Sequence, residues 1–224
     1  MVEYELIRTK RKTVAIYIRD GRVEVRAPLR TPGKDIDRFV ESKEKWIKEK
    51  LAITNERAEK RGSFALEYGS FIAYRGKQYI IEAKEGGAAG FDGNRFYLPP
   101  DMAPERIKAV CVRIYRLLAK RFLPDRTYEI ARTMAAAPAS VRITDARTRW
   151  GSCSAKKSIN YSWRLIMADD DIIDYIIVHE LAHLTELNHS ERFWAIVGEV
   201  LPDYPERQAR LKELQHKLAN EDWS

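Results

Sequence analysis

Three of the chain's four histidines fall within eleven residues, and their spacing could support metal chemistry. The segment is His179-Glu180-Leu181-Ala182-His183-Leu184-Thr185-Glu186-Leu187-Asn188-His189. In an α-helix, side chains four residues apart lie about 40° apart around the axis and one turn above each other. His179 and His183 can therefore bind a single ion, and Glu180 can reach a water molecule bound to it. This pattern predicts a zinc site with its own general base, as in a metal-dependent hydrolase.

His189 is the candidate third ligand, but only if the helix ends before it. A continuous helix would place His189, six residues after His183, about 240° around the axis and away from the ion. Asn188 is a suitable helix end, because asparagine tolerates the left-handed conformation found just past helix ends. Ser190 then suits the N-cap of a following helix. Three histidines and an open water position are typical of a catalytic zinc site, whereas a structural site usually has a fourth protein ligand.

The alternative is that these histidines are ordinary core or surface residues, because an H-E-x-x-H pattern also arises by chance. The helix that carries them is apolar nearly all round, as expected of a buried helix. Burying imidazoles and a carboxylate there is costly unless a metal compensates, so we expect a metal site. His216, by contrast, is expected to be a solvated residue of the polar C-terminal segment. Cys153 could be a fourth ligand, but a half-buried strand residue is the interpretation we favour.

The positive charge of the chain is unevenly spread. The net charge is +7, of which residues 1–100 carry +6. Residues 147–164 hold five basic residues, no acidic residue, and Trp150, Tyr161 and Trp163, so this segment could contact a nucleic acid. A two-stranded hairpin with its aromatic side chains buried and its charges outside is the interpretation we favour.

The composition of the chain indicates where in the cell the protein is located. No stretch is apolar over the roughly 18 residues of a membrane span, and the N-terminus lacks the apolar core of a signal peptide. Cys111 and Cys153 are too few for a disulfide framework. We therefore expect a cytoplasmic protein without a membrane span.

The first hundred residues are expected to be rich in short strands. The pattern predicts a hairpin of Thr13–Ile18 with Arg22–Ala27 around Asp20-Gly21, and a second hairpin of Phe71–Tyr74 with Tyr79–Glu82 around Arg75-Gly76. A charged amphipathic helix is predicted between them at about 35–61, and a last strand at Arg95–Leu98. Trp46 is expected on the apolar side of the helix. Pro99, Pro100 and Pro104 then predict a boundary between domains at 1–100 and 101–224.

The second half is expected to place strands before the histidine-bearing helix. We predict one or two helices over 104–137, broken near Pro124, and then strands at Val141–Ser152 and Ile159–Ile166 joined by the turn 154–158. Three helices follow: the histidine-bearing helix after Asp169 to Asp171, a helix from Glu191, and a polar helix at about 205–218. The chain is therefore of the α+β class. A strand beside the metal-bearing helix could bind an extended peptide as an added strand.

Several short runs around the histidines form one combined motif. They are Thr148-Arg149-Trp150-Gly151-Ser152-Cys153-Ser154, Ile159-Asn160, Trp163-Arg164-Leu165, Asp174-Tyr175, His179-Glu180-Leu181-Ala182-His183-Leu184, and Asn188-His189-Ser190 with Phe193-Trp194. In order and spacing they strongly resemble the YgjP-like metal-dependent hydrolase family, which looks related to the WLM and SprT-like zinc proteases. Metzincins share the histidine spacing but have a glycine where this chain has Glu186, so we do not assign the chain to them.

The sequence pattern predicts a β-rich N-terminal region with a long helix. The resemblance implies that a compact zincin-like metallopeptidase domain follows it, with a small sheet and an active-site helix. It implies zinc held by His179, His183 and His189, with Glu180 as the catalytic base. Zinc would lower the pKa of its water and polarise the scissile carbonyl. Glu180 would take the proton of the water and pass it to the leaving amine. The substrate would be a protein or a peptide.

The sequence leaves two other classes of function open. SprT-like proteases are known for repair of DNA–protein crosslinks, so a nucleic-acid-associated protein with DNA-conditional protease activity is one alternative. A non-catalytic module stabilised by zinc is the other, although Glu180 argues against it, because a structural site needs no base. The group that stabilises the tetrahedral oxyanion is also open, with Tyr161, Arg164 and Tyr204 as candidates by position.

Overall fold

The computed structural model describes residues 2–19 and 21–223, which pack as two compact units of mixed α and β structure. The first unit holds residues 2–64 and 217–222, and the second holds 65–216 and Trp223. The division after Phe64 differs from the predicted boundary at residue 100, because residues 65–100 pack with the segments that follow them. The Tyr115 hydroxyl donates to the Ala73 carbonyl at 2.5 Å, and the Arg75 N–H donates to the Ile166 carbonyl at 2.9 Å.

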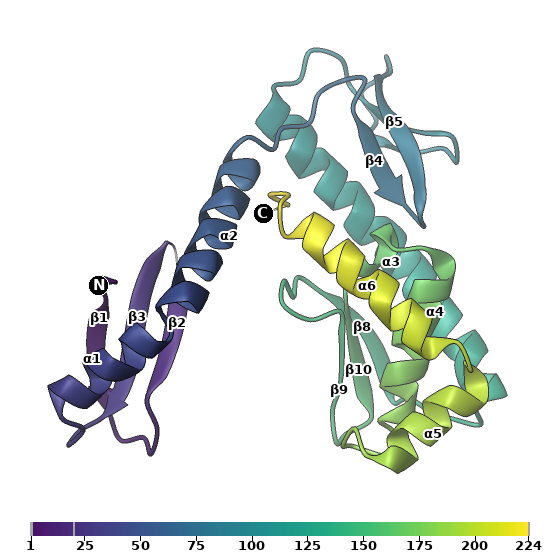
Figure 1. Cartoon of the computed structure of the whole chain (residues 1–224). Coiled ribbons are helices and arrows are strands. Elements are labelled where there is room, and N and C mark those ends of the chain that lie inside the picture. Colours follow the sequence, from purple (N-terminus) through teal and green to yellow (C-terminus); the bar gives the residue numbers. More distant parts are fainter. Residues whose placement is uncertain (1, 20, 224) are drawn as a thin grey trace. The chain divides into compact units, whose positions relative to one another are not determined.

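The first unit is a three-stranded sheet of order β1-β3-β2 with two helices along it (Figure 1). Its elements are β1 (Glu5–Thr9), β2 (Ala15–Arg19), β3 (Arg22–Pro28), α1 (Gly33–Ser42) and α2 (Glu44–Gly62). The antiparallel pairing of β2 with β3 confirms the predicted hairpin, while Asp20 of its turn lies outside the described residues. Alternate residues of β3 are buried against the helices, and the shared core consists of Val23, Val25, Ala27, Ile36, Val40 and Ile47.

Three features of this unit differ from the prediction. The helix expected over 35–61 is two helices separated at Lys43, whose φ of −110° and ψ of 8° interrupt the helical backbone. Trp46, expected on the apolar side, is 42% exposed, and Ile47 enters the core instead. β1 was not predicted at all. It pairs in parallel with β3, and parallel pairing joins segments that no local turn connects.

The second unit begins with a four-stranded sheet of order β4-β5-β7-β6. Its strands are β4 (Phe71–Tyr74), β5 (Lys77–Ala83), β6 (Gly90–Phe91) and β7 (Arg95–Leu98). The predicted hairpin of β4 and β5 is confirmed, and its turn residues Arg75 and Gly76 both have the positive φ that tight hairpin turns require.

A second, three-stranded sheet of order β8-β10-β9 lies next to the histidine-bearing helix. Its strands are β8 (Ser140–Thr144), β9 (Gly151–Cys153) and β10 (Ser158–Ser162). β9 and β10 pair antiparallel across the predicted turn, whereas β8 runs parallel to β10. The strands predicted over 141–152 and 159–166 are too long. Residues 145–150 form a loop, and Trp163–Met167 form a buried 3-10 helix, η1, whose sequence is apolar except for Arg164 and resembles that of a buried strand.

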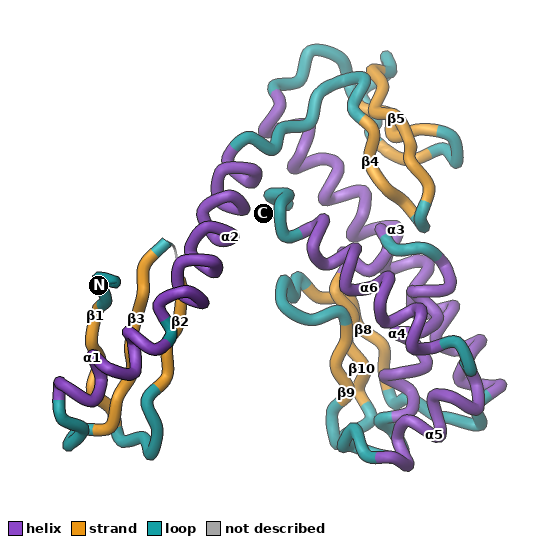
Figure 2. Tube along the Cα trace, viewed as in Figure 1, coloured by secondary structure: helices purple, strands orange, loops and turns teal. Residues whose placement is uncertain are grey.

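Helices pack around this sheet (Figures 1 and 2). They are α3 (Pro104–Thr133), α4 (Asp170–Ala182), α5 (Glu191–Val200) and α6 (Tyr204–Leu218). α3 packs on η1, α4 and β8, and α4 packs on β9 and α5. α3 continues through Pro124, although a break was predicted there. The turns on either side of Pro124 bury Ala119, Leu123 and Thr127, and this packing offsets the roughly 3 kcal/mol that an internal proline costs. None of the described helices is both long and apolar enough to cross a bilayer.

Candidate metal centre

α4 and its C-cap residue provide His179 and His183, and the helix is fixed in rotation by its surroundings. Most of its side chains are buried, which fits its apolar sequence. Arg126 of α3 forms a two-pronged ion pair with Asp174, with N···O distances of 2.8 and 2.6 Å. Such a forked pair constrains orientation as well as distance. Helix α4 therefore presents His179 and His183 in a defined direction.

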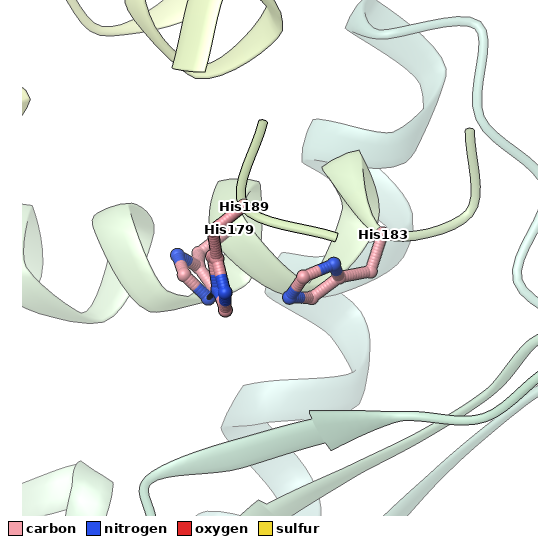
Figure 3. A group of neighbouring side chains, drawn as sticks. All are labelled: His179, His183 and His189. Carbon is pink, nitrogen blue, oxygen red and sulfur yellow. Dashed lines mark hydrogen bonds between the residues drawn. The ribbon is translucent and has the colours of Figure 1, made fainter. Parts of the chain in front are cut away.

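The structure brings all three predicted histidines together (Figure 3). One nitrogen of each ring belongs to a group whose atoms lie within 4.8 Å of one another. The Nε2 atoms of His179 and His189 are 3.0 Å apart. His179 is half-buried on α4, His183 directly follows the last residue of that helix, and His189 is exposed in the segment that leads to α5.

The helix ends before His189, as the site requires, but not where the sequence predicted. α4 ends at Ala182, and Asn188 does not have the left-handed conformation expected of a helix stop. The N–H groups of Leu184 and Thr185 donate to carbonyls three residues back, which tightens the last turn. The chain then turns back to place His189 beside His179. The prediction for the next helix is confirmed, since the Ser190 hydroxyl caps α5 by accepting from the Phe193 N–H.

The imidazoles are suited to bind a metal as neutral ligands. Burial, and then the charges of His183 and His189, lower the pKa of His179 to about 3, and burial likewise lowers the pKa of His189. The Nδ1 atom of His183 lies 3.0 Å from the Glu186 carbonyl, and donating a hydrogen bond there leaves Nε2 as a free lone pair.

Zinc fits this donor set. The 3.0 Å between the Nε2 atoms of His179 and His189 is close to the roughly 3.4 Å expected of two nitrogen ligands at tetrahedral angles around one zinc ion. Three histidines without a fourth protein ligand are the donor set of a catalytic site.

Glu180 is the buried acid of the site. Its side chain is 5% exposed, and its Oε2 atom has no hydrogen-bond partner among the described residues. Burial raises the pKa of Glu180 to about 8, and the charge of Arg149 opposes this rise. A poorly solvated carboxylate with a perturbed pKa is typical of a functional group rather than of a structural one.

Gly151 makes room for that carboxylate. A Cβ atom built on Gly151 would lie 2.5 Å from Oε1 of Glu180 and 2.7 Å from its Cγ atom. Strand β9 can therefore pass directly beside Glu180 only because residue 151 has no side chain. The sequence analysis placed Gly151 in the family motif without assigning it this role.

Aromatic rings surround the exposed third histidine. Trp194 stacks on His189 with ring centroids 5.8 Å apart and an interplanar angle of 27°. Tyr204 stacks in turn on Trp194 at 5.1 Å and 15°. Phe193 contacts all three imidazoles, with centroid separations of 4.5 to 4.9 Å. α5 therefore supplies an apolar wall that orients His189.

The other candidate residues lie outside the histidine group. Among the described residues this group contains neither Cys153, which is half-buried on β9 as predicted, nor His216, which is exposed on α6. Tyr161 is fully buried, with its hydroxyl 3.4 Å from that of Thr127. Arg164 is also buried, and it donates to Asp145 at 2.9 Å and to the Trp223 carbonyl at 3.1 Å.

Tyr161 and Arg164 are therefore not open to a substrate, whereas Tyr204 lies in the aromatic stack beside His189. Arg149 is the residue whose role the sequence analysis missed, because it was counted among the five basic residues and in the family motif without being assigned to the site. Its position next to Trp150-Gly151, in the run that contacts Glu180, was the available signal.

Comparison with known proteins places the chain in a family. No curated protein matches it in sequence. Two solved structures of metallopeptidase zymogens are similar: Pyrococcus abyssi abylysin (25% identity, 40% of this chain and 91% of that chain, TM-score 0.38) and Methanocaldococcus jannaschii jannalysin (20% identity, 42% and 96%, TM-score 0.38). The YgjP-like metallopeptidase domain matches residues 12–214, which include every residue of the site described above. The chain therefore belongs to the YgjP-like family of metal-dependent peptidases.

Proposed function

We propose that the protein is a zinc peptidase in which His179, His183 and His189 hold the metal and Glu180 is the general base. One observation carries this proposal: three imidazole nitrogens lie within 4.8 Å of one another, beside a buried carboxylate with one oxygen that has no hydrogen-bond partner in the described part of the chain. Charge-neutral nitrogen ligands and an adjacent acid are what hydrolysis by an activated water requires. A purely structural zinc site would have no use for Glu180.

Glu180 performs the proton transfers. Zinc, when bound, supplies Lewis acidity that polarises the scissile carbonyl and makes water a stronger acid. Glu180 accepts the proton of the attacking water and later delivers it to the leaving amine. The burial of Glu180 holds the proton out of bulk solvent between the two transfers.

The free edge of β9 binds the peptide. The Ser162 N–H donates to the Trp150 carbonyl, and the Ser154 N–H donates to the Ser158 carbonyl. In an antiparallel pair every second residue bonds to the partner strand, so residues 150, 152 and 154 direct their backbone groups toward β10. Gly151 consequently directs its backbone N–H and C=O away from β10, toward the uncovered edge. An extended peptide added there would lie beside Glu180, with its backbone hydrogen-bonded to β9.

The test combines metal analysis with a cleavage assay. The purified protein should contain zinc by elemental analysis and should cleave members of a random peptide library, as followed by mass spectrometry. Glu180→Gln should keep the zinc and lose cleavage, because the amide cannot accept the proton. Full activity in that variant would remove Glu180 from the mechanism, and zinc binding without any peptide cleavage would refute the peptidase assignment.

A further inference from the structure

A polar hollow lies on the face of the β8-β10-β9 sheet that points away from the core. Ile159 and Tyr161 of β10 are fully buried, so Asn160 between them points to the opposite face. Ser152 pairs with Asn160 in register and shares that face. The hollow has a volume of about 360 Å³, and its polar lining consists of Thr144, Arg149, Ser152, Asn160 and Ser162.

Arg149 is the one charged residue in the lining of this hollow. Within residues 2–19 and 21–223 its guanidinium makes no hydrogen bond or ion pair, although its charge lowers the pKa of Glu180. The guanidinium is exposed and carries donors in a planar fork, which suits a carboxylate. Its partner is therefore not supplied by the described part of the chain.

The remaining polar groups of the hollow fall into two kinds. The hydroxyls of Thr144 and Ser162 already donate, at 3.2 Å to the Tyr161 carbonyl and at 2.7 Å to the Ala146 carbonyl. Among the residues that the structure describes, the side chains of Ser152 and Asn160 make one long contact of 3.5 Å, with each other. The Ser152 hydroxyl and the Asn160 amide can therefore donate to a ligand, beside Arg149. Three donors and no acidic side chain define a site for an anion.

A peptide on the edge of β9 would reach this hollow with alternate side chains. Residues directly opposite each other in neighbouring strands have their side chains on the same face of the sheet. The peptide residue opposite Gly151 would face Glu180. The peptide residue opposite Ser152 would face the hollow and Arg149.

We propose that this hollow is a subsite for a carboxylate of the peptide substrate, with Arg149 as its cation and Ser152 and Asn160 as additional donors. The carboxylate comes from an Asp or Glu side chain next to the residue that faces Glu180, or from the free C-terminus of a peptide that ends there. This inference rests on the proposed function in one respect, because it places the peptide along β9.

The same surface does not favour the phosphate backbone of a nucleic acid. Of the five basic residues in the segment 147–164, only Arg149 lines the hollow. Arg164 is buried and bonded to Asp145. A polyanion would need several cations along its path, whereas a single carboxylate needs one.

The test measures binding separately from cleavage. The zinc-loaded Glu180→Gln protein is titrated with fluorescein-labelled octapeptides of Ala, Gly and Ser that carry one Asp or one Asn at each position in turn, with amidated C-termini. At one position, fluorescence anisotropy should show that the Asp peptide binds about tenfold more tightly than the Asn peptide. This difference in affinity is the one expected of a charge-assisted hydrogen bond. The same peptides without Asp, but with a free C-terminal carboxylate, distinguish the two sources of the charge.

Two variants identify the cation. Arg149→Gln should abolish the preference for the carboxylate. Arg142→Gln is the matched control, because Arg142 is exposed on β8, pairs with Asn160 on the same sheet face and does not line the hollow. It removes the same charge and should keep the preference.

The outcomes separate this inference from the proposed function. Equal binding of Asp and Asn peptides at every position, together with equal binding of amide and free-acid peptides, would overturn the subsite. An equal loss of the carboxylate preference in Arg149→Gln and Arg142→Gln would also overturn the subsite, because the preference would then depend on the overall positive charge and not on the hollow. If the active protein cleaves neutral peptides but shows no carboxylate preference, the peptidase stands and the subsite falls. A preference in binding without cleavage of any peptide would leave the subsite and refute the peptidase.

Discussion

Replacing Gly151 with alanine should cripple the proposed base while leaving the metal ligands untouched. The backbone of Gly151 does not have a positive φ, so alanine is compatible with its conformation. The new Cβ atom would lie 2.5 Å from Oε1 of Glu180. Ordinary contact between these atoms requires about 3.4 Å or more, so either the carboxylate or β9 must move by about 1 Å.

A displacement of this size has a calculable effect on catalysis. A 1 Å misplacement of a catalytic group lowers the rate about 100-fold, which corresponds to about 2.7 kcal/mol of transition-state stabilisation. We therefore expect kcat/KM of Gly151→Ala to fall about 100-fold on any peptide that the protein cleaves. Overpacking should also lower the free energy of unfolding by about 1–3 kcal/mol. The three heavy atoms nearest to the new methyl group all belong to Glu180, so zinc content should not change.

The assay compares steady-state kinetics, zinc content and thermal unfolding with those of a second glycine variant. Gly198→Ala in α5 is the matched control, because a Cβ atom there would lie at an ordinary 3.6 Å from the Tyr204 ring. It should leave kcat/KM unchanged and stabilise the helix slightly. Wild-type kcat/KM in a folded, zinc-loaded Gly151→Ala protein would refute the contact between β9 and Glu180 as the reason for glycine at this position.

Further perturbations test the parts that hold the metal. His189→Ala should weaken zinc binding by more than about 100-fold in a chelator competition, and unchanged affinity would remove His189 as a ligand. Trp194→Ala should weaken zinc binding about tenfold by freeing His189, and Trp194→Phe should restore most of it if stacking is the cause. Removing zinc with a chelator should lower the melting temperature, because the metal binds the folded chain. Arg126→Ala should lower the free energy of unfolding by about 1–3 kcal/mol in urea, because it leaves Asp174 half-buried and unpaired.

The part of the site on α4 could be predicted because it depends on local geometry alone. Helical spacing brings His179 and His183 together whatever the rest of the chain does. The cap at Ser190 is local in the same way. The end of α4 was predicted too late, with the stop at Asn188 instead of after Ala182, because Leu184 and Leu187 continue the apolar pattern while the backbone has already tightened after Ala182.

The rest of the site depends on segments that meet only in the folded chain. Gly151 reaches Glu180 because β9 pairs with β10 and packs on α4. The parallel pairing of β8 with β10 joins segments separated by a loop and another strand, and no pattern of alternating residues reveals it. The boundary after Phe64 was missed for a similar reason, because residues 65–100 are held by contacts such as that of Tyr115 with Ala73.

The run from Arg149 to Ser152 connects the proposed chemistry with the proposed selectivity. Gly151 faces the base on one side of the sheet, and the next residue, Ser152, faces the hollow on the other. Catalysis and substrate choice should therefore respond to different substitutions within one short strand. Arg149 is the exception, because its charge also acts on Glu180, so Arg149→Gln changes the base as well as the subsite. The kinetics of Arg149→Gln alone therefore cannot separate the two effects of Arg149. Peptide binding to a protein that already carries Glu180→Gln can separate them, because that protein has no carboxylate at residue 180.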